Sequence, residues 1–334
     1  MTRVAACLLL LGIAASARAE LPPPGDCAGV YWDLTAIFEE GDQIYARVLL
    51  TRVGPGELGA AGQGHWIDPD GTPTAFQNGR SAGRFEIDPS GRVLRIGSTG
   101  LDLASPTHVF SVDNDKRGVK LRVEVDAAEA VALPIHGGGL AVEVVHLASR
   151  ARARAWREGM ETPRALAGRA TWIRTTHAVC ERDLSAWRVD VHRLAADAGL
   201  LGIHEQLASG EARSWWGWRD ADGGVATRRP ARVAVEGWRR DASGEVLPRR
   251  LRPAGADLGG DVAIAGSRLA VDPLDALPRL ARMLYWFGAN PRRVWADAEL
   301  ALSSDASPPP RGPALASFTL LRDPPPTLPP ETGR

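Results

Sequence analysis

The chain has almost no lysine, and after its first nineteen residues it has no apolar run that approaches the length of a membrane span. Lysine occurs only at Lys116 and Lys120, so nearly all of the 40 basic residues are arginine, and 40 acidic residues balance them. A net charge near zero offers no general electrostatic attraction for nucleic acid or an anionic membrane. We therefore expect neither a nucleic-acid partner nor a transmembrane segment.

Residue patterns for metal and hydrolase chemistry are also missing. The seven histidines include no HExxH motif and no cluster with cysteine, so zinc binding is not expected. His136 precedes three glycines, as in the oxyanion loop of lipases, but the chain has no Gly-x-Ser-x-Gly motif to present a nucleophile. The sequence predicts no metal and no cofactor.

The first nineteen residues have the pattern of a secretory signal peptide. A basic start at Arg3 is followed by an apolar stretch and then by Ala17-Arg18-Ala19, a small-x-small cleavage pattern. Cleavage is expected before Glu20, which predicts a mature protein that is periplasmic or secreted. Loss of Arg3 and Arg18 leaves 40 − 2 = 38 basic residues against 40 acidic ones.

Removal of the signal peptide also removes Cys7 and leaves one pair of cysteines, Cys27 and Cys180. An exported protein meets an oxidising environment, in which such a pair can form a disulfide. The bond would join the start of the mature chain to its second half and contribute roughly 5 kcal/mol in the chain-entropy model. Two separate buried thiols are the alternative, and the sequence leaves both open.

One phrase has part of the pattern of a calcium-binding loop. In GHWIDPDGTP, Asp68 and Asp70 precede Gly71 at the right spacing, but Trp66 and Gln77 occupy the positions that should carry the first and last oxygen ligands. Aspartate favours the first corner of a type I turn, and glycine accepts the positive φ that closes a hairpin. The phrase therefore predicts a hairpin turn.

The turn phrase recurs and indicates an internal repeat. Its four copies begin at Asp68, Asp88, Asp220 and Asp241. The copies are 88 − 68 = 20 and 241 − 220 = 21 residues apart, and the second pair is displaced from the first by 152 or 153 residues. DLTA from Asp33 and DLSA from Asp183 have nearly the same offset. Such self-similarity predicts two related domains of about 150 residues each.

Apolar and polar residues alternate at period two over most of the chain, which predicts an all-β fold. Alternating Arg and Ala over residues 149–157 predict one solvated face of a long strand, and helical periodicity is expected only over 184–199 and 273–284. Many short strands in halves of this size favour antiparallel barrels or strongly curved sandwiches.

Several segments resemble a known family in their order and patterning. They are GVYWDLTAIFEEGDQIYARVLLTRVGPGE, GHWIDPDG, FQNGR, FEIDPSGRVLRIG, LDLASPTHVF and GRATWIRTTHAV. They look like the lipocalin-like double domain of AttH, hydroxyneurosporene synthase (carotenoid hydratase) and survival-factor proteins, over residues 27–325 in outline. The hydratase branch opens with Glu-Trp-Trp-Tyr, whereas this chain has Tyr31-Trp32 followed by Asp33, which weakens the transfer of hydratase chemistry.

The resemblance implies two tandem lipocalin-like (calycin-type) antiparallel β-barrels, which the repeat relates by internal duplication, with an apolar ligand cavity. The expected organisation is a signal peptide at 1–19, a first barrel at 20–166, a second barrel at 167–322 and a proline-rich disordered tail at 323–334.

Three side chains are candidates for proton transfer. Glu205 shares a strand face with apolar residues in LLGIHEQLAS, where the charged carboxylate is disfavoured and the group can serve as a general acid. His177 in ATWIRTTHAV and Asp33 are the other two candidates. The structural alternatives are a carboxylate paired with an arginine for Glu205 and a core histidine bonded to a hydroxyl for His177.

The aromatic residues that we predict to line a ligand cavity are Tyr31, Trp32, Trp66, Trp172, Trp216 and Trp218. The segment WWGW places Trp216 and Trp218 on one strand face and Trp215 on the other. A buried indole needs a partner for its N–H, so eleven tryptophans are costly as filler. Packing in the barrel cores is the alternative for most of them.

Three functions remain open from the sequence. The first is an exported protein that binds a hydrophobic small molecule, a lipid or an isoprenoid, in one barrel or between the two. The second is a hydratase-like enzyme that protonates an isoprenoid double bond from Glu205, Asp33 or His177. The third is an envelope interaction module with filled barrels. The binding protein is our first prediction, and the sequence does not indicate an oligomeric state.

Overall fold

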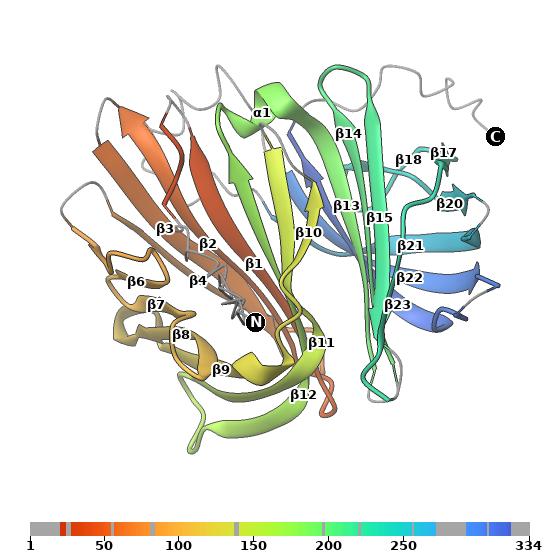
Figure 1. Cartoon of the computed structure of the whole chain (residues 1–334). Helices are drawn as coiled ribbons and strands as arrows, with labels where there is room; N and C mark the ends of the chain where they lie inside the picture. Colours follow the sequence, from red (N-terminus) through yellow and green to blue (C-terminus); the bar gives the residue numbers. More distant parts are fainter. Residues whose placement is uncertain are drawn as a thin grey trace, which may run out of the picture.

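The computed structural model describes residues 21–24, 28–54, 57–80, 84–136, 140–195, 198–219, 222–255, 257–271, 292–305 and 307–321. Two large antiparallel sheets account for most of these residues, and each sheet curls into a half-barrel (Figure 1). The predicted all-β fold is therefore confirmed. No helix in the described ranges is long and apolar enough to cross a membrane.

The first sheet begins at the N-terminal end of the described chain. It consists of β1 (Gly29–Phe38), β2 (Gln43–Gly54), β3 (Glu57–Ile67), β4 (Pro73–Arg80), β5 (Glu86–Ile87), β6 (Val93–Ile96), β7 (Thr99–Asp102), β8 (Thr107–Asn114), β9 (Val119–Asp126), β10 (Leu133–His136), β11 (Leu140–Arg157) and β12 (Arg164–His177). Its strand order is β4-β3-β2-β1-β12-β11-β9-β8-β7-β6-β5, with β10 added beside β11. Two 3-10 turns, η1 (Asp115–Arg117) and η2 (Ala127–Glu129), flank β9.

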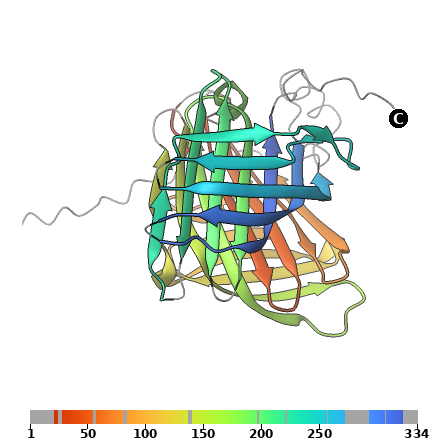
Figure 2. The same cartoon turned by 90° about the vertical axis from the view of Figure 1, so that its right-hand side faces the viewer.

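The second sheet follows a single helical turn, α1 (Glu181–Leu184). It consists of β13 (Ser185–Leu194), β14 (Gly199–Leu207), β15 (Ala212–Arg219), β16 (Val225–Arg228), β17 (Arg232–Glu236), β20 (Arg250–Ala254), β21 (Gly259–Val271), β22 (Arg292–Ser303) and β23 (Gly312–Leu320). Its order is β16-β15-β14-β13-β23-β22-β21-β20-β17, while β18 (Arg239–Arg240) and β19 (Val246–Leu247) form a separate hairpin. In Figure 2 the blue strands near the C-terminus cross the green strands steeply, which shows the curl of this sheet.

The two sheets repeat one topology. In each, four consecutive strands pair as neighbours, and the first of the four also pairs with the last strand of the sheet: β1 with β12, and β13 with β23. The chain thus forms two tandem lipocalin-like antiparallel β-barrels related by internal duplication. DLTA and DLSA do not occupy equivalent places in this repeat, because Asp33 lies within β1 whereas Asp183 lies in α1.

The repeated turn phrases connect adjacent strands, as predicted. In three of them the glycine amide donates to the carbonyl oxygen of the first aspartate, from Gly71 to Asp68, from Gly91 to Asp88 and from Gly244 to Asp241, at 2.9–3.0 Å. Each of these glycines has a φ between 75° and 86°, the region that glycine adopts at little cost. In the fourth copy Gly223 has a φ of 85°, and Asp220 lies outside the described residues.

Two expectations from the sequence need correction. The helix expected over 184–199 is wrong, because most of this segment forms β13 and pairs with β14 and β23. The expected boundary at 166/167 cuts through β12, which belongs to the first sheet because it pairs with β1 and β11. The sheets change between His177 and Ser185. Residues 273–284 and 323–334 lie outside the described chain.

Alternate residues of the central strands point into a barrel or toward the other barrel. Val30, Trp32 and Leu34 belong to the core of the first barrel, and Val189 and Val191 belong to that of the second. In β11 the alanines at 151, 153 and 155 are buried while the arginines between them are exposed, as the Arg/Ala alternation predicts. The opposite faces of β1 and β13 bring the two barrels together.

Candidate functional site: the seam between the two barrels

The seam is the layer where the outer faces of the two half-barrels meet, with β11 and β12 beside β13 and β14. One apolar cluster joins Ile173 of the first barrel to Ile203 and Trp215 of the second. Another joins Tyr45 to Trp295, whose rings stack with centroids 4.9 Å apart. Charged side chains fill the space between these clusters.

At the centre of the seam, Asp33 binds two arginines from different barrels. Arg47 of β2 donates from Nε and Nη2 to its two carboxylate oxygens, each at 2.8 Å. Arg293 of β22 donates from Nη2 to Oδ1, also at 2.8 Å. Arg47 also lies over the ring of Tyr31, 3.9 Å from its centroid. Asp33 therefore joins the two barrels through a buried, charge-assisted contact.

A second ion pair lies beside the first. Arg188 of β13 donates from Nε to Asp190 at 2.6 Å and from Nη1 to the hydroxyl of Thr175 in β12 at 3.2 Å. Glu205 of β14 is 2 % exposed, and its charge acts on Arg188. Together these residues form what we call the seam charge cluster: Asp33, Arg47, Arg188, Asp190, Glu205 and Arg293.

The cluster fixes the protonation of its members. Burial by itself would raise the pKa of Asp33, but Arg293 and Arg47 outweigh it and hold that pKa far below its usual range. Burial opposes the charge of Arg188, yet Asp190 more than offsets it and raises the pKa of that guanidinium. Asp33 is therefore ionised at physiological pH, which suits a structural or orienting role better than the role of a proton donor.

A small cavity borders the seam charge cluster. About 10 Å³ is open to the centre of a water molecule, which is room for about one. Its polar lining comes from Asp33, Thr35, Asp190, His192, Arg293 and Ser317. Burial lowers the pKa of His192 to about 4, so its imidazole is neutral at physiological pH.

A larger cavity lies at one end of the seam, and we call it the seam cavity. It is partly open to solvent and has a volume of about 290 Å³. It is lined by Ile37, Phe38, Glu39, Arg150, Gly168, Arg169, Leu194 and Ala195. Phe38 and Leu194 are the last residues of β1 and β13, the equivalent first strands of the two sheets. The cavity thus has apolar walls from both barrels and an arginine-bearing wall from β11 and β12.

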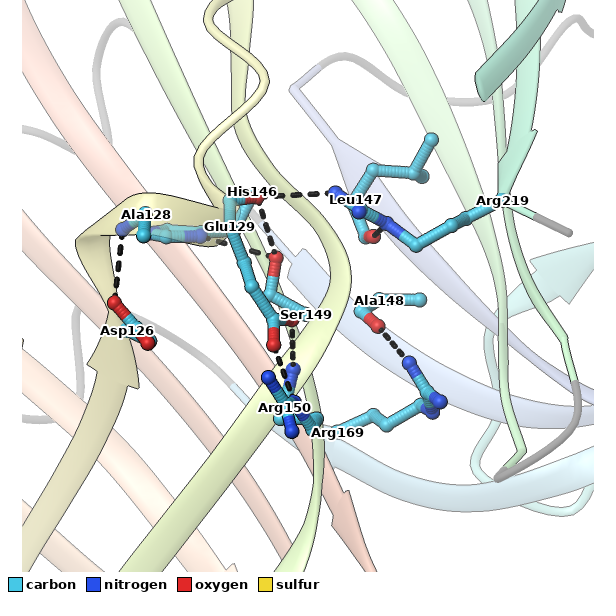
Figure 3. A network of polar contacts seen from close by, with 10 residues as sticks. All are labelled: Asp126, Ala128, Glu129, His146, Leu147, Ala148, Ser149, Arg150, Arg169 and Arg219. Carbon is cyan, nitrogen blue, oxygen red and sulfur yellow. Dashed lines mark hydrogen bonds and ion pairs between the residues drawn. The ribbon is translucent and has the colours of Figure 1, made fainter. Parts of the chain in front are cut away.

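That arginine-bearing wall is held by a β-bulge in β11 (Figure 3). Ala148 at the bulge has a φ of 48°, and its carbonyl oxygen accepts a 2.7 Å bond from Nη1 of Arg169. Arg150 pairs with the carboxylate of Glu129. Arg219 of the second barrel donates to the carbonyl oxygens of Leu147 and Glu129, at 3.1 and 3.0 Å.

A buried histidine pair continues this network into the first barrel. His146 lies 2.8 Å from His108 between ring nitrogens, and its Nδ1 lies 3.1 Å from the hydroxyl of Ser149. The Ser149 hydroxyl donates to the carbonyl oxygen of Glu129 at 3.1 Å, so it accepts from His146. Burial lowers the pKa of both histidines, that of His146 to about 3. The pair is neutral and connects the barrel interior to the bulge.

Comparisons with known proteins relate this architecture to solved structures. No family model and no curated protein matches the sequence. The crystal structure of a protein from Nitrosomonas europaea assigned to AttH matches with a TM-score of 0.61 at 12% identity, over 88% of this chain and 92% of that one. The chain has an AttH-like fold. The structure of CghA with Sch210972 matches with a TM-score of 0.56 at 13% identity, over 89% of each chain, and CghA alone with 0.55 at 13%, over 92% and 97%.

Within this AttH-like fold, four residues predicted from the sequence come together at the seam. Tyr31 and Asp33 lie on β1, Glu205 lies on β14, and His177 ends β12. The rings of Tyr31 and His177 have centroids 6.1 Å apart, and Nδ1 of His177 lies 2.7 Å from the carbonyl oxygen of Val179. No observation tests the catalytic roles predicted for Asp33, Glu205 and His177 or the ligand-binding role predicted for Tyr31, and these roles stay predictions.

The predicted tryptophans are placed elsewhere in the AttH-like fold. Trp32, Trp66 and Trp172 pack in the core of the first barrel, and Trp216 and Trp218 pack in that of the second, each at most 1% exposed. In the described part of the chain, none of the five lines either cavity of the seam. Their assignment to ligand binding stays a prediction.

Sequence reasoning missed the arginines of the seam charge cluster. Arg47 and Arg188 stand between apolar neighbours in QIYARVLL and SAWRVDV, and Arg293 lies between Arg292 and Val294 in RRVWADA. An arginine beside apolar residues of a strand was the available signal, but Arg47 and Arg293 bind Asp33 across 14 and 260 positions. Arg188 pairs with Asp190 two residues away on its own strand.

Cys180 is disulfide-bonded. Cys27 lies outside the described residues, so the predicted pairing of Cys27 with Cys180 stays a prediction. Among the described residues, no group of three or more His, Cys, Asp or Glu side chains is placed to hold a metal ion.

Proposed function

We propose that this chain is an exported protein that binds a hydrophobic small molecule, a lipid or an isoprenoid, in the seam cavity between its two barrels. The observation that carries the proposal is the cavity itself, with apolar walls from the ends of β1 and β13. The signal-peptide pattern of residues 1–19 supports export. Cleavage before Glu20 would be seen in the intact mass of the mature protein.

The size and lining of the seam cavity suit such a ligand. Ligand sites are concave, mostly apolar, about 300–1,000 Å³ in volume and oriented by a few polar groups. The seam cavity, at about 290 Å³, lies just below this range. It combines the apolar side chains of Ile37, Phe38 and Leu194 with the polar side chains of Glu39, Arg150 and Arg169. The fold relative CghA has been solved with the compound Sch210972, which supports small-molecule binding by this architecture.

The packing of the barrels favours the seam over their interiors. The tryptophans of both cores are buried against other side chains, so a ligand there would have to displace them. The hydratase alternative gains less support, since Asp33 is held as an anion between two guanidinium groups. Filled barrels also suit an interaction module, and the experiment below separates this from a binding protein.

The proposal is tested by native mass spectrometry of the protein purified from its own host, followed by lipid extraction. Ala195 lines the seam cavity, and the Ala195→Trp variant would fill it. Ala208 is equally half-buried, lies in the turn after β14 and is remote from the cavity lining, so Ala208→Trp is the matched control. We expect a co-purifying hydrophobic molecule in the wild type and in Ala208→Trp, and at least a tenfold loss of it in Ala195→Trp.

Two outcomes would contradict the proposal. A wild-type protein that carries no small molecule, and takes none up from lipid extracts, would favour the interaction module. Equal ligand content in the two tryptophan variants would place the ligand away from the seam cavity. A ligand that gains water on incubation with the protein would instead support the hydratase alternative.

A further inference from the structure

Two side chains that line the small cavity beside the seam charge cluster each have a buried polar atom with no partner among the described residues. They are Nδ1 of His192 and Nε of Arg293. His192 is 2 % exposed and Arg293 is 8 % exposed, so bulk water does not satisfy either group. Buried polar atoms are ordinarily hydrogen-bonded, and leaving one unsatisfied is costly. The cavity therefore has the features of a site that is completed by another molecule.

The hydrogen-bonding capacity of the two atoms indicates which kind of molecule can complete the site. Nε of Arg293 can only donate a hydrogen bond, while a neutral imidazole offers one donor and one acceptor nitrogen. The hydroxyls of Thr35 and Ser317 and the carboxylate of Asp190 also line the cavity. A group that accepts a hydrogen bond from Arg293 and donates one to His192 satisfies both nitrogen atoms. An O–H group does so within the space of about one water molecule.

The small cavity and the seam cavity are lined by neighbouring residues of the same two strands. Thr35 and His192 line the small cavity, whereas Ile37 and Leu194 line the seam cavity two residues further along the same faces of β1 and β13. Two residues of a strand span about 7 Å. The small cavity thus lies one side-chain step deeper in the seam.

We propose that the small cavity is a subsite for a single O–H group, which binds water in the free protein and the hydroxyl of an alcohol when a ligand occupies the seam cavity. The second part of this proposal rests on the proposed function, and the first part does not. The second part narrows the class of ligand expected in the seam cavity to hydrophobic alcohols. The seam charge cluster beside the site has three carboxylates and three guanidinium groups, which balance in charge. A neutral O–H group therefore suits the site better than an ion.

The test compares 1-decanol, methyl decyl ether and decane, which share an apolar chain but differ in the O–H group. Binding to the full-length mature protein is measured by native mass spectrometry and by quenching of tryptophan fluorescence, since Trp295 lines the small cavity. We expect the wild type to prefer 1-decanol over the ether by about tenfold, the effect of one hydrogen bond.

His192→Phe is the test variant, because it removes the nitrogen acceptor. We expect the preference to fall to within about twofold while decane binding is unchanged. His204→Phe is the matched control: His204 is 2 % exposed and bonded to Ser214 within the second barrel, so its loss should leave the preference intact. Crystal structures of the wild type, free and with 1-decanol, decide the question even if His192→Phe does not fold.

An oxygen atom within hydrogen-bond distance of His192 and Arg293 supports the proposal. A water there with no preference for 1-decanol assigns the subsite to water alone. An empty cavity in both crystals, or one whose lining has closed over the two nitrogens, overturns it. Failure of all three compounds to bind would count against the seam ligand, and the free crystal would still decide the water subsite.

Discussion

At the residue scale, the most consequential side chain is Asp33, which accepts hydrogen bonds from an arginine of each barrel. Desolvation of buried charges is expensive, so such a cluster is stable only while every charge keeps its partner. The sequence marked Asp33 as a candidate proton donor and Tyr31 as a candidate ligand contact, because both belong to the segment that stands where the hydratase branch has Glu-Trp-Trp-Tyr. It did not predict Arg47 or Arg293, because strand pairing and barrel docking bring these residues to Asp33 across 14 and 260 positions.

The substitution Asp33→Asn should therefore destabilise the protein strongly. A neutral amide at this position would leave the buried guanidinium groups of Arg47 and Arg293 without a carboxylate, at a cost of about 3–5 kcal/mol in the free energy of unfolding. Urea denaturation followed by tryptophan fluorescence measures this change. Asp261 is the control, because it pairs with Arg252 where both side chains are 43% exposed, and Asp261→Asn should cost less than about 1 kcal/mol. Similar losses for the two variants would contradict the role given to Asp33.

At the scale of elements, strand periodicity predicted the fold well where one face of a strand meets a core. It failed over residues 184–199, because both faces of β13 are buried, one in the second barrel and one at the seam. With apolar and polar residues buried on both sides, the period of two is blurred and a helical pattern emerges. The bulge of β11 was also beyond prediction, since it depends on Arg219 of the other barrel and on its close contact with Gly199.

The contact between the bulge and Gly199 makes a specific prediction. A Cβ atom on Gly199 would lie 1.8 Å from the Cβ of Ala148, so Gly199→Ala should force the barrels apart and cost about 2 kcal/mol or more. Ala148→Gly removes the obstructing methyl group and suits the φ of 48°, so it should be neutral or slightly stabilising.

A double-mutant cycle separates these effects. In the Ala148→Gly background, Gly199→Ala should lose most of its cost in urea denaturation. Gly266→Ala is the control for the general effect of replacing glycine in a strand, because nothing lies within 4 Å of a Cβ at that position. Additive effects of the two substitutions would show that the barrels do not meet at Ala148 and Gly199.

At the scale of the whole molecule, buried histidines predict the response of stability to pH. Burial lowers the pKa of His146 to about 3 and those of His65, His192 and His204 to about 4. The same groups have a pKa of about 6.5 in the unfolded chain. The unfolded state thus binds more protons below pH 6.5, and the contribution of these groups to stability is complete above pH 6.5 and is lost as the pH falls toward 4.

We therefore expect the free energy of unfolding to decline between pH 6.5 and pH 5, as measured by urea denaturation at each pH. His204→Phe removes one of these groups. The free energy of unfolding of this variant should therefore fall less steeply with decreasing pH than that of the wild type, by up to about 1.4 kcal/mol per pH unit. A wild-type curve that is flat over this range would show that the histidines are accessible to protons in the folded state.

The repeat, the all-β fold and the hairpin turns followed from local chemistry and could be predicted from the sequence. The seam could not, because it arises from the docking of two duplicated faces, whose contacts join residues of different sheets, such as Leu147 with Arg219 across 72 positions and Asp33 with Arg293 across 260. Its cavities nevertheless provide the most direct test of the proposed function. That test is a crystal structure of the protein purified with its native ligand. We predict electron density for the ligand between Ile37, Phe38 and Leu194 in the seam cavity, whereas density inside a barrel, beside Trp172 or Trp216, would contradict the account.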